Sequence, residues 1–255
     1  MEAALGASAV ADGSNLASGE VRSSVVWETR FVMLAFLSPV VISAVLVLAQ
    51  HLSGAGDVGR FPSVVANQFM NMLLGILAYL PTLAMVPLAL FLLRRTGQGP
   101  DVLGLGAPSI KRDMLPGLGI AAAAFGIEIL MVLPFAALFA HHPSLVNHVA
   151  VGNVPKYYVI EGIVMSAVTA VTEEALVNGY LLTRLGQLGW TPRGSLILSL
   201  LLRTSYHVYY GLAFLLTVPL GYLVTRSFQK HHKLNRPIAA HFLFDAVLFT
   251  FSILH

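Results

Sequence analysis

Seven apolar stretches, most of them long enough to cross a lipid bilayer as helices, dominate this chain. A helix rises about 1.5 Å per residue, so about 20 apolar residues cross the hydrocarbon core. The stretches cover 30–51, 66–93, 115–140, 157–184, 193–209, 211–228 and 236–254. The fifth stretch is short enough to be partly re-entrant and almost touches the sixth, so six or eight spans are alternatives. We therefore expect an all-α, polytopic transmembrane helix bundle.

The composition supports a membrane protein. Hydrophobic residues make up 56% of the chain and charged residues 11%, with a mean hydropathy of +0.78, which is too apolar for a soluble globule. Residues 1–27 are rich in Ala, Gly and Ser and lack the apolar core of a signal peptide, which predicts a mobile tail. Residues 28–255 are expected to form a single transmembrane domain, with the active site mainly in 157–250.

The basic residues predict the orientation, because Lys and Arg in loops are held on the cytoplasmic side. Twelve of the fifteen fall on one predicted face: Arg22, Arg30, Arg94, Arg95, Lys111, Arg112, Arg184, Arg193, Arg226, Lys230, Lys233 and Arg236. This places the amino terminus in the cytoplasm, and the composition suits a bacterial inner (plasma) membrane. The basic residues form no patch with interleaved aromatics, so nucleic acid is not an expected partner. The chain has no cysteine, which excludes a thiolate nucleophile and a Cys-based zinc site.

Ionisable residues inside the spans point to a functional site, because such groups are costly at bilayer depth. The fourth span contains TEEALVNGY at 172–180, where Glu173 and Glu174 point about 100° apart on a helix. We expect one carboxylate to face a cavity and the other to face a neighbouring helix. The alternative is a structural pair that bridges helices through Arg203, Tyr or Thr groups.

Two further polar segments can converge on these glutamates. In LLRTSYHVYYG at 201–211, Arg203 and His207 share a helical face, so the arginine can neutralise a carboxylate of the fourth span. His207 could instead be an interfacial anchor among its neighbouring tyrosines. In AAHFLFDAV at 239–247, His241 and Asp245 lie one turn apart, which suits two ligands or donors aimed at one point, or an aspartate that orients its histidine.

The order of these motifs resembles the CAAX protease and bacteriocin-processing family, also called CPBP or Abi. That family has an EExxxR motif, then a motif ending in His, then HxxxN or HxxxD, within a bundle of membrane helices. The likeness covers about 157–250 of this chain. It implies an intramembrane, glutamate-dependent endopeptidase that acts on a membrane-embedded or lipidated peptide or protein.

The resemblance also implies roles for the residues that match. Glu173, assisted by His207, would activate the attacking water, Glu174 would support the site, and His241 with Asp245 would face the developing oxyanion. Asn178 stands where the family motif has arginine, and Arg203 is the candidate to replace that charge.

The departure at Asp245 leaves open whether a metal takes part. Asp245 stands where many relatives have asparagine, and an ionised aspartate cannot donate to an oxyanion. It must be protonated, orient His241 or hold a metal. Glu173, His207, His241 and Asp245 could together hold Zn²⁺, although the chain lacks the HExxH motif of zinc proteases.

Two other functions remain alternatives. One is a non-catalytic membrane scaffold or immunity protein with the same fold, which the asparagine at 178 favours. The other is a proton-coupled transporter with Glu128, Glu173 and Asp245 as a relay. Glu128, in the third span, otherwise serves helix packing or lines the substrate cavity.

Overall fold

The fold is all-α, as expected. The computed structural model describes residues 19–54, 65–142, 145–147 and 154–254. Its α-helices are α1 (Gly19–Leu52), α2 (Gln68–Tyr79), α3 (Met85–Arg95), α4 (Leu115–His141), α5 (Val159–Glu173), α6 (Leu182–Gln187), α7 (Pro192–Ser205), α8 (Val218–His231) and α9 (Asn235–Leu254). Within the described ranges, extended pairing is limited to an isolated bridge between Val146 and Gly211. Each of the seven predicted stretches coincides with a helical segment.

Within the part of the chain that the structure describes, four helical segments are long and apolar enough to cross a membrane: Gly19–Leu52, Gln68–Arg95, Ile110–His141 and Asn235–Leu254. Their large apolar side chains point outward, with Phe31 69% and Leu130 68% exposed. Only 6% of the spanning window that contains α4 is buried inside the protein. An apolar exterior of this extent requires lipid around it. The protein is therefore a polytopic helical membrane protein.

Several predicted boundaries were wrong. Helix α1 begins at Gly19, so residues 19–27 of the expected tail are helical, and residues 1–18 lie outside the described part. The second stretch contains a 3₁₀ segment, Leu80–Ala84, at Pro81, because proline has no N–H for the helical ladder. The fifth and sixth stretches are less helical than expected. Helix α7 ends at Ser205, and 3₁₀ turns at Val208–Tyr210 and Leu212–Thr217 lead into α8.

The fourth stretch contains a feature that hydropathy does not reveal. Between α5 and α6 the helix widens into a π-helix, η7, over Glu174–Leu181. Segments of π-helix are rare and occur often at functional sites. The change of helix type falls between the two adjacent glutamates.

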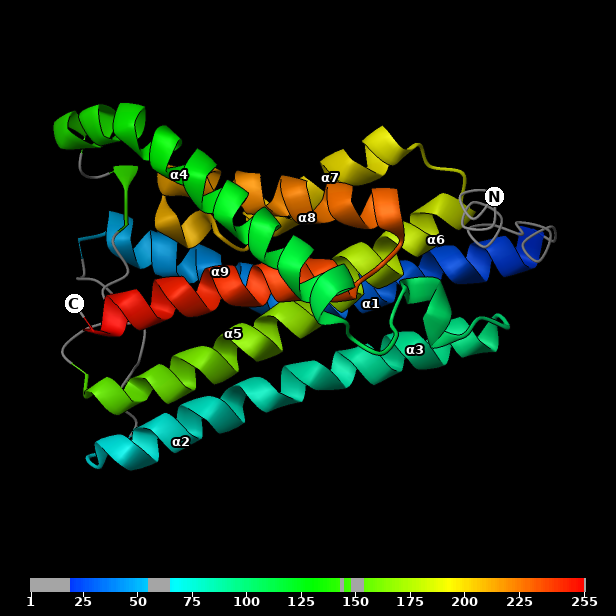
Figure 1. Cartoon of the computed structure of the whole chain (residues 1–255), viewed down its shortest axis with the longest axis horizontal. Helices are drawn as coiled ribbons and strands as arrows, with labels where there is room; N and C mark the ends of the chain where they lie inside the picture. Colours follow the sequence, from blue (N-terminus) through cyan, green and yellow to red (C-terminus); the bar gives the residue numbers. More distant parts are fainter. Residues whose placement is uncertain (1–18, 55–64, 143–144, 148–153, 255) are drawn as a thin grey trace.

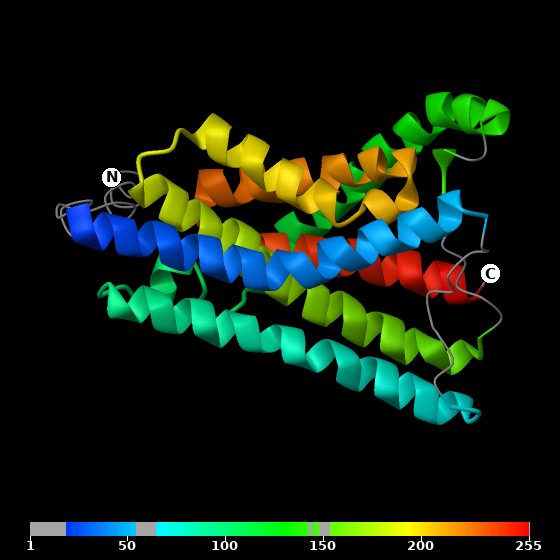
Figure 2. The ribbon, with the colours of Figure 1, turned by 180° about the vertical axis from the view of Figure 1, so that it is seen from behind.

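Helices α5 and α9 lie side by side at the centre of the bundle, with α2 against α5 and α4 against α9 (Figure 1). Helix α8 packs against α4, α7 and α9 on the same side as α4. The reverse view shows α1 running across the front of this group (Figure 2). The start of α1 and the ends of α3 and α6 lie at one end of the bundle, opposite the end of α9.

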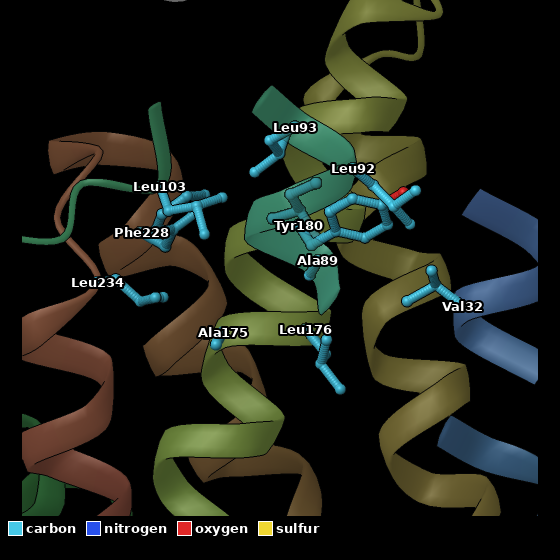
Figure 3. Close-up of a cluster of buried hydrophobic side chains, with 11 residues drawn as sticks. Val32, Ala89, Leu92, Leu93, Leu103, Ala175, Leu176, Tyr180, Phe228 and Leu234 are labelled. Carbon is cyan, nitrogen blue, oxygen red and sulfur yellow. The ribbon is translucent and has the colours of Figure 1, made fainter. Parts of the chain in front are cut away.

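The main apolar core supports the π-helix. Ala175, Leu176 and Tyr180 of η7 are fully or almost fully buried among side chains from α1, α3 and α8 (Figure 3). One side of η7 thus packs into the core, and the side that carries Glu174 is held in a defined direction. The core also includes Leu103, which has no exposed surface.

Leu103 lies in the 94–113 connection, which the sequence presents only as a polar loop. A short 3₁₀ helix, Pro100–Leu103, turns its leucine inward. The next residue, Gly104, has φ +65° and accepts a backbone hydrogen bond from Leu234, at the start of α9. The loop is thereby attached to the α8–α9 turn.

We expect Gly104→Ala to lower the stability of the protein by at least about 1–3 kcal/mol, because the left-handed backbone is strained for a residue with a side chain. A Cβ there would also lie 2.0 Å from the carbonyl oxygen of His232. Thermal unfolding in detergent measures the change. Gly106→Ala is the matched control, since a Cβ at Gly106 meets nothing within 4 Å. Equal unfolding midpoints for the two variants would contradict this account.

Candidate active site

The adjacent glutamates at the α5–η7 junction point toward different helices, as the helical geometry predicts. Glu173 faces α7, where its Oε2 accepts a hydrogen bond from the Tyr206 hydroxyl at 2.5 Å. Glu174 faces α9, where its Oε1 lies 2.8 Å from Nδ1 of His241. The side chain of Glu173 is 12% exposed, whereas that of Glu174 is completely buried. The two carboxylates therefore occupy different environments although they are neighbours in the chain.

Arg203 of α7 lies between the two carboxylates. Its guanidinium is 3.4 Å from Oε2 of Glu173 and 2.9 Å from Oε1 of Glu174. The expected pairing of Arg203 with the glutamates of the preceding span is therefore present. Gly221 of α8 makes room for the arginine, since a Cβ there would lie 3.2 Å from the arginine Cδ. A single buried cation thus offsets charge from two buried anions.

A polar chain continues from Glu174 to α8. Asn178, one turn along η7, donates from Nδ2 to Oε2 of Glu174 at 2.5 Å. Thr225 of α8 donates to Oδ1 of Asn178 at 2.9 Å, and its hydroxyl lies 3.1 Å from that of Ser199 of α7. All of these side chains are buried, so their polar atoms need such partners. Asn178 stands in place of an arginine, and Arg203 brings a positive charge to the glutamate from another helix.

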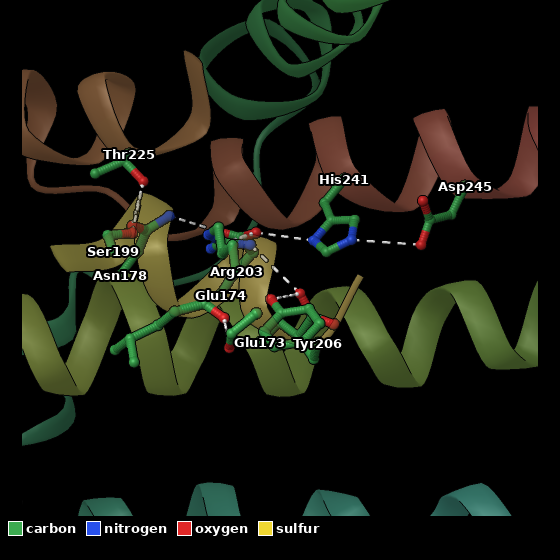
Figure 4. Close-up of polar contacts among 11 residues, drawn as sticks. Glu173, Glu174, Asn178, Ser199, Arg203, Tyr206, Thr225, His241 and Asp245 are labelled. Carbon is green, nitrogen blue, oxygen red and sulfur yellow. Dashed lines mark hydrogen bonds and ion pairs between the residues drawn. The ribbon is translucent and has the colours of Figure 1, made fainter. Parts of the chain in front are cut away.

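His241 of α9 lies between two carboxylates (Figure 4). Its Nδ1 contacts Glu174 at 2.8 Å, and its Nε2 is 3.4 Å from Oδ2 of Asp245, one turn along the same helix. The second distance is longer than an ordinary hydrogen bond. Both histidine nitrogens thus face acids, and Asp245 has the geometry of a residue that orients His241.

His207 lies beside this network in an aromatic group. It follows directly on Tyr206, just beyond the end of α7, with ring centroids 4.8 Å from Tyr206 and 6.1 Å from Tyr210. The sequence expectation placed His207 one helical turn from Arg203. In the structure the helix has already ended, and Tyr206 is the residue that reaches Glu173.

Sequence reasoning did not assign Tyr206, Ser199 or Thr225 to the site, although its structural alternative allowed for Tyr and Thr groups beside the glutamates. A signal for two of them was present in the chain. Ser199, Arg203 and Tyr206 recur at spacings of four and three residues, which is the spacing of one helical face at the end of α7. Thr225 gave no such signal, because hydroxyl residues are common in membrane helices and its partners lie on other elements.

The proposed zinc ligands do not gather around one point. Among the described residues, no group of three or more His, Asp or Glu side chains could hold a metal ion. Glu128 of α4 is half-buried, on a helix that packs against α9, the helix of Asp245. The stacking of Phe125 on Phe244, with ring centroids 4.2 Å apart, holds the two helices together at this level.

The segment that carries these contacts matches a family model. Residues 155–247 match the family described as type II CAAX prenyl endopeptidase Rce1-like. This stretch carries an Rce1-like domain. The resemblance to the CAAX protease family inferred from the motifs is therefore confirmed over this range. No curated protein and no solved structure matches the chain.

The Rce1-like domain includes every residue of the network described above. It begins just before α5 and ends within α9, so α1 to α4 lie outside the match. Those helices include three of the four candidate membrane spans. The matched domain thus contributes the polar cluster, and the preceding helices contribute much of the apolar surface around it.

Proposed function

We propose that the protein is an intramembrane endopeptidase that hydrolyses a peptide bond of a membrane-associated, lipidated substrate. The observation that carries this proposal is the meeting of adjacent glutamates with His241 and Arg203, from three helices, within the matched Rce1-like range. Peptide hydrolysis needs a base for water and a donor for the developing oxyanion. Carboxylates and an imidazole held at neighbouring positions supply both.

Glu173 is the general base in this proposal. Both of its contacts, with Arg203 and Tyr206, are made through Oε2, and its side chain is more exposed than that of Glu174. This leaves Oε1 oriented to accept a proton from water. His207, next to Tyr206, assists in holding the water. The resulting hydroxide adds to the substrate carbonyl carbon, and the proton later passes to the leaving amine, which gives a carboxylic acid and an amine.

Glu174 supports the site and does not attack or accept a proton. Arg203, Asn178 and His241 occupy its two oxygens, and it has no exposed surface. A carboxylate with this many donors is held in one orientation. It fixes Nδ1 of His241 as a donor, so that the ring presents Nε2 on its other side.

His241 is the proposed oxyanion donor, through Nε2. The 3.4 Å separation from Asp245 is long, so a developing oxyanion can take this hydrogen bond. Since Glu174 already receives a proton from Nδ1, donation from Nε2 requires the imidazolium form. Asp245 stabilises that form by its negative charge and holds the ring plane, which accounts for an aspartate where relatives have asparagine.

The substrate class follows from the family and the membrane. The family is named for CAAX prenyl endopeptidases, so a prenylated protein is the first candidate. We further propose seven spans, a cytoplasmic amino terminus and a bacterial inner membrane. The positions of the basic residues support this orientation, since Arg22, Arg95 and Arg184 lie at the end of the bundle where α1 starts and α3 and α6 end.

The test is proteolysis of a peptide panel by the purified protein, with each sequence offered in prenylated and unmodified forms. We expect the wild type to cleave a prenylated peptide, and Glu173→Ala and His207→Ala to lose this activity. Wild-type cleavage that survives both substitutions would overturn the mechanism. Elemental analysis of the active protein, with and without a chelator, measures any metal that it carries.

A non-catalytic scaffold or immunity protein is the second candidate, and the asparagine at 178 in place of the family arginine is the observation that favours it. The two candidates differ in what the glutamates do for the cell. If Glu173→Ala and His207→Ala variants preserved the cellular phenotype, the scaffold would be the better account.

A further inference from the structure

A basic cavity of about 590 Å³ lies among α4, α8 and α9, apart from the polar network of the proposed active site. Its charged wall consists of Arg226, Lys230, His231 and Arg236. Its apolar wall includes Pro116, Ile120 and Leu223. None of the network residues lines it. This volume lies within the range of small-molecule sites.

The positive charge in this cavity is not balanced by its lining, which includes no Asp or Glu among the described residues. Arg226 donates to the neutral Gln229 side chain at 3.0 Å. Arg236 donates from Nε to the carbonyl oxygen of Arg112 at 2.6 Å, and the same Nε forms a 4.0 Å ion pair with Asp113, which is not among the lining residues. The cavity therefore presents cationic donors to its interior.

The neighbouring basic residues also act on His231. Partial burial lowers the pKa of His231 from its ordinary value, and the neighbouring charges of Arg236, Lys230 and His232 lower it further. Like charges disfavour the protonated imidazole. An anion bound in the cavity would reverse this effect.

The cavity also lies where two helices enter the membrane. Pro116 and Ile120 belong to the first turns of α4, and Arg236 belongs to the first turn of α9, and both helices are part of candidate spans. Helix α8 brings Arg226 and Lys230 from its last turns to the same level. Exposed Leu115 and Leu118 continue the apolar surface of α4 toward lipid. Basic pockets between membrane helices at this level suit lipid headgroups.

We propose that this cavity binds a phosphate-bearing anion, namely the headgroup of an anionic phospholipid whose acyl chains lie along α4. The phosphate contacts Arg226, Lys230 and Arg236, and the acyl chains pack against the exposed leucines. Guanidinium groups match phosphate geometry and lysine adds a point charge. The proposal does not depend on the peptidase function.

The test uses the full-length protein, purified in detergent and freed of lipid, with phosphatidylglycerol and phosphatidylcholine added together. Native mass spectrometry resolves which lipid remains bound. A double variant, Arg226→Gln with Lys230→Gln, removes two charges from the cavity. The matched control, Arg94→Gln with Lys111→Gln, removes two exposed charges from the same face of the membrane, outside the cavity.

We expect the wild type and the control to retain phosphatidylglycerol in preference to phosphatidylcholine. In the cavity variant, the affinity for phosphatidylglycerol should fall about 25-fold, because each of the two basic residues contributes roughly a fivefold effect. Circular dichroism checks that both variants fold. Equal retention by the two double variants, or equal binding of the two lipids by the wild type, would overturn the proposal.

Inorganic phosphate distinguishes the two sources of the same chemistry. Millimolar phosphate that displaces phosphatidylglycerol from the wild type, but not from the cavity variant, supports recognition of the headgroup. The opposite result is that phosphate binds the wild type but not the cavity variant, and that phosphatidylglycerol binds neither. That result would identify a soluble anion as the ligand and overturn the lipid assignment.

Discussion

Replacing Glu173 with glutamine is expected to reduce the rate of peptide hydrolysis by about 10²–10⁴-fold, the usual contribution of a general base. Glutamine keeps the size of the side chain and can still accept a hydrogen bond from Tyr206, but it cannot take a proton from water. The loss should appear in kcat, because the substrate still binds. Single-turnover cleavage of a prenylated peptide in detergent measures it.

Glu161→Gln is the matched control for this experiment. Glu161 lies on the same helix and is also buried, with its carboxylate against Gly75 of α2, where a Cβ would lie 1.8 Å from Oε1. It takes no part in the network that joins Glu173 to Arg203. We expect its activity to stay within about twofold of the wild type, since no proton transfer passes through it. Equal losses in the two variants would indicate a general effect of altering buried carboxylates in α5.

Replacing Arg203 with methionine is expected to destabilise the protein by about 3–5 kcal/mol, because removal of one partner leaves buried charge without compensation. Arg203 is the cation between Glu173 and Glu174, and both carboxylates are almost or completely buried. Methionine fills much of the same volume, so the loss of charge dominates over a cavity. Thermal unfolding in detergent measures the effect.

A triple variant separates charge from packing at this site. Glu173→Gln and Glu174→Gln added to Arg203→Met remove the unbalanced charges together, so most of the lost stability should return. An Arg203→Met protein as stable as the wild type would show that the arginine does not compensate the glutamates. Failure of the triple variant to recover stability would assign the loss to packing against Gly221.

Much of the architecture follows from local properties of the sequence. The helix positions could be predicted because hydropathy over about 20 residues decides whether a segment can lie in a membrane. The adjacent glutamates stood out for the same reason, since charge is costly there. Their different directions follow from the rotation of about 100° per residue in a helix.

The partners across helices could not be predicted in the same way. Tyr206, the residue that caps the end of α7, reaches Glu173, whereas His207 lies one residue further along among aromatic rings. Hydropathy does not report where a helix ends within an apolar stretch, nor the bridge that pairs Val146 with Gly211 beyond that end.

By itself, the sequence determined that this chain is an apolar helical bundle with ionisable residues inside three particular segments. Both the preference of an apolar segment for lipid and the period of a helix depend only on residues close together in the chain. Only the tertiary structure decided that Arg203 forms ion pairs with both glutamates and that Thr225 donates a hydrogen bond to Asn178. It also decided that Glu174 lies in a π-helix. These contacts join helices far apart in the chain. Their geometry depends on how neighbouring helices pack, and a single helix does not contain that information.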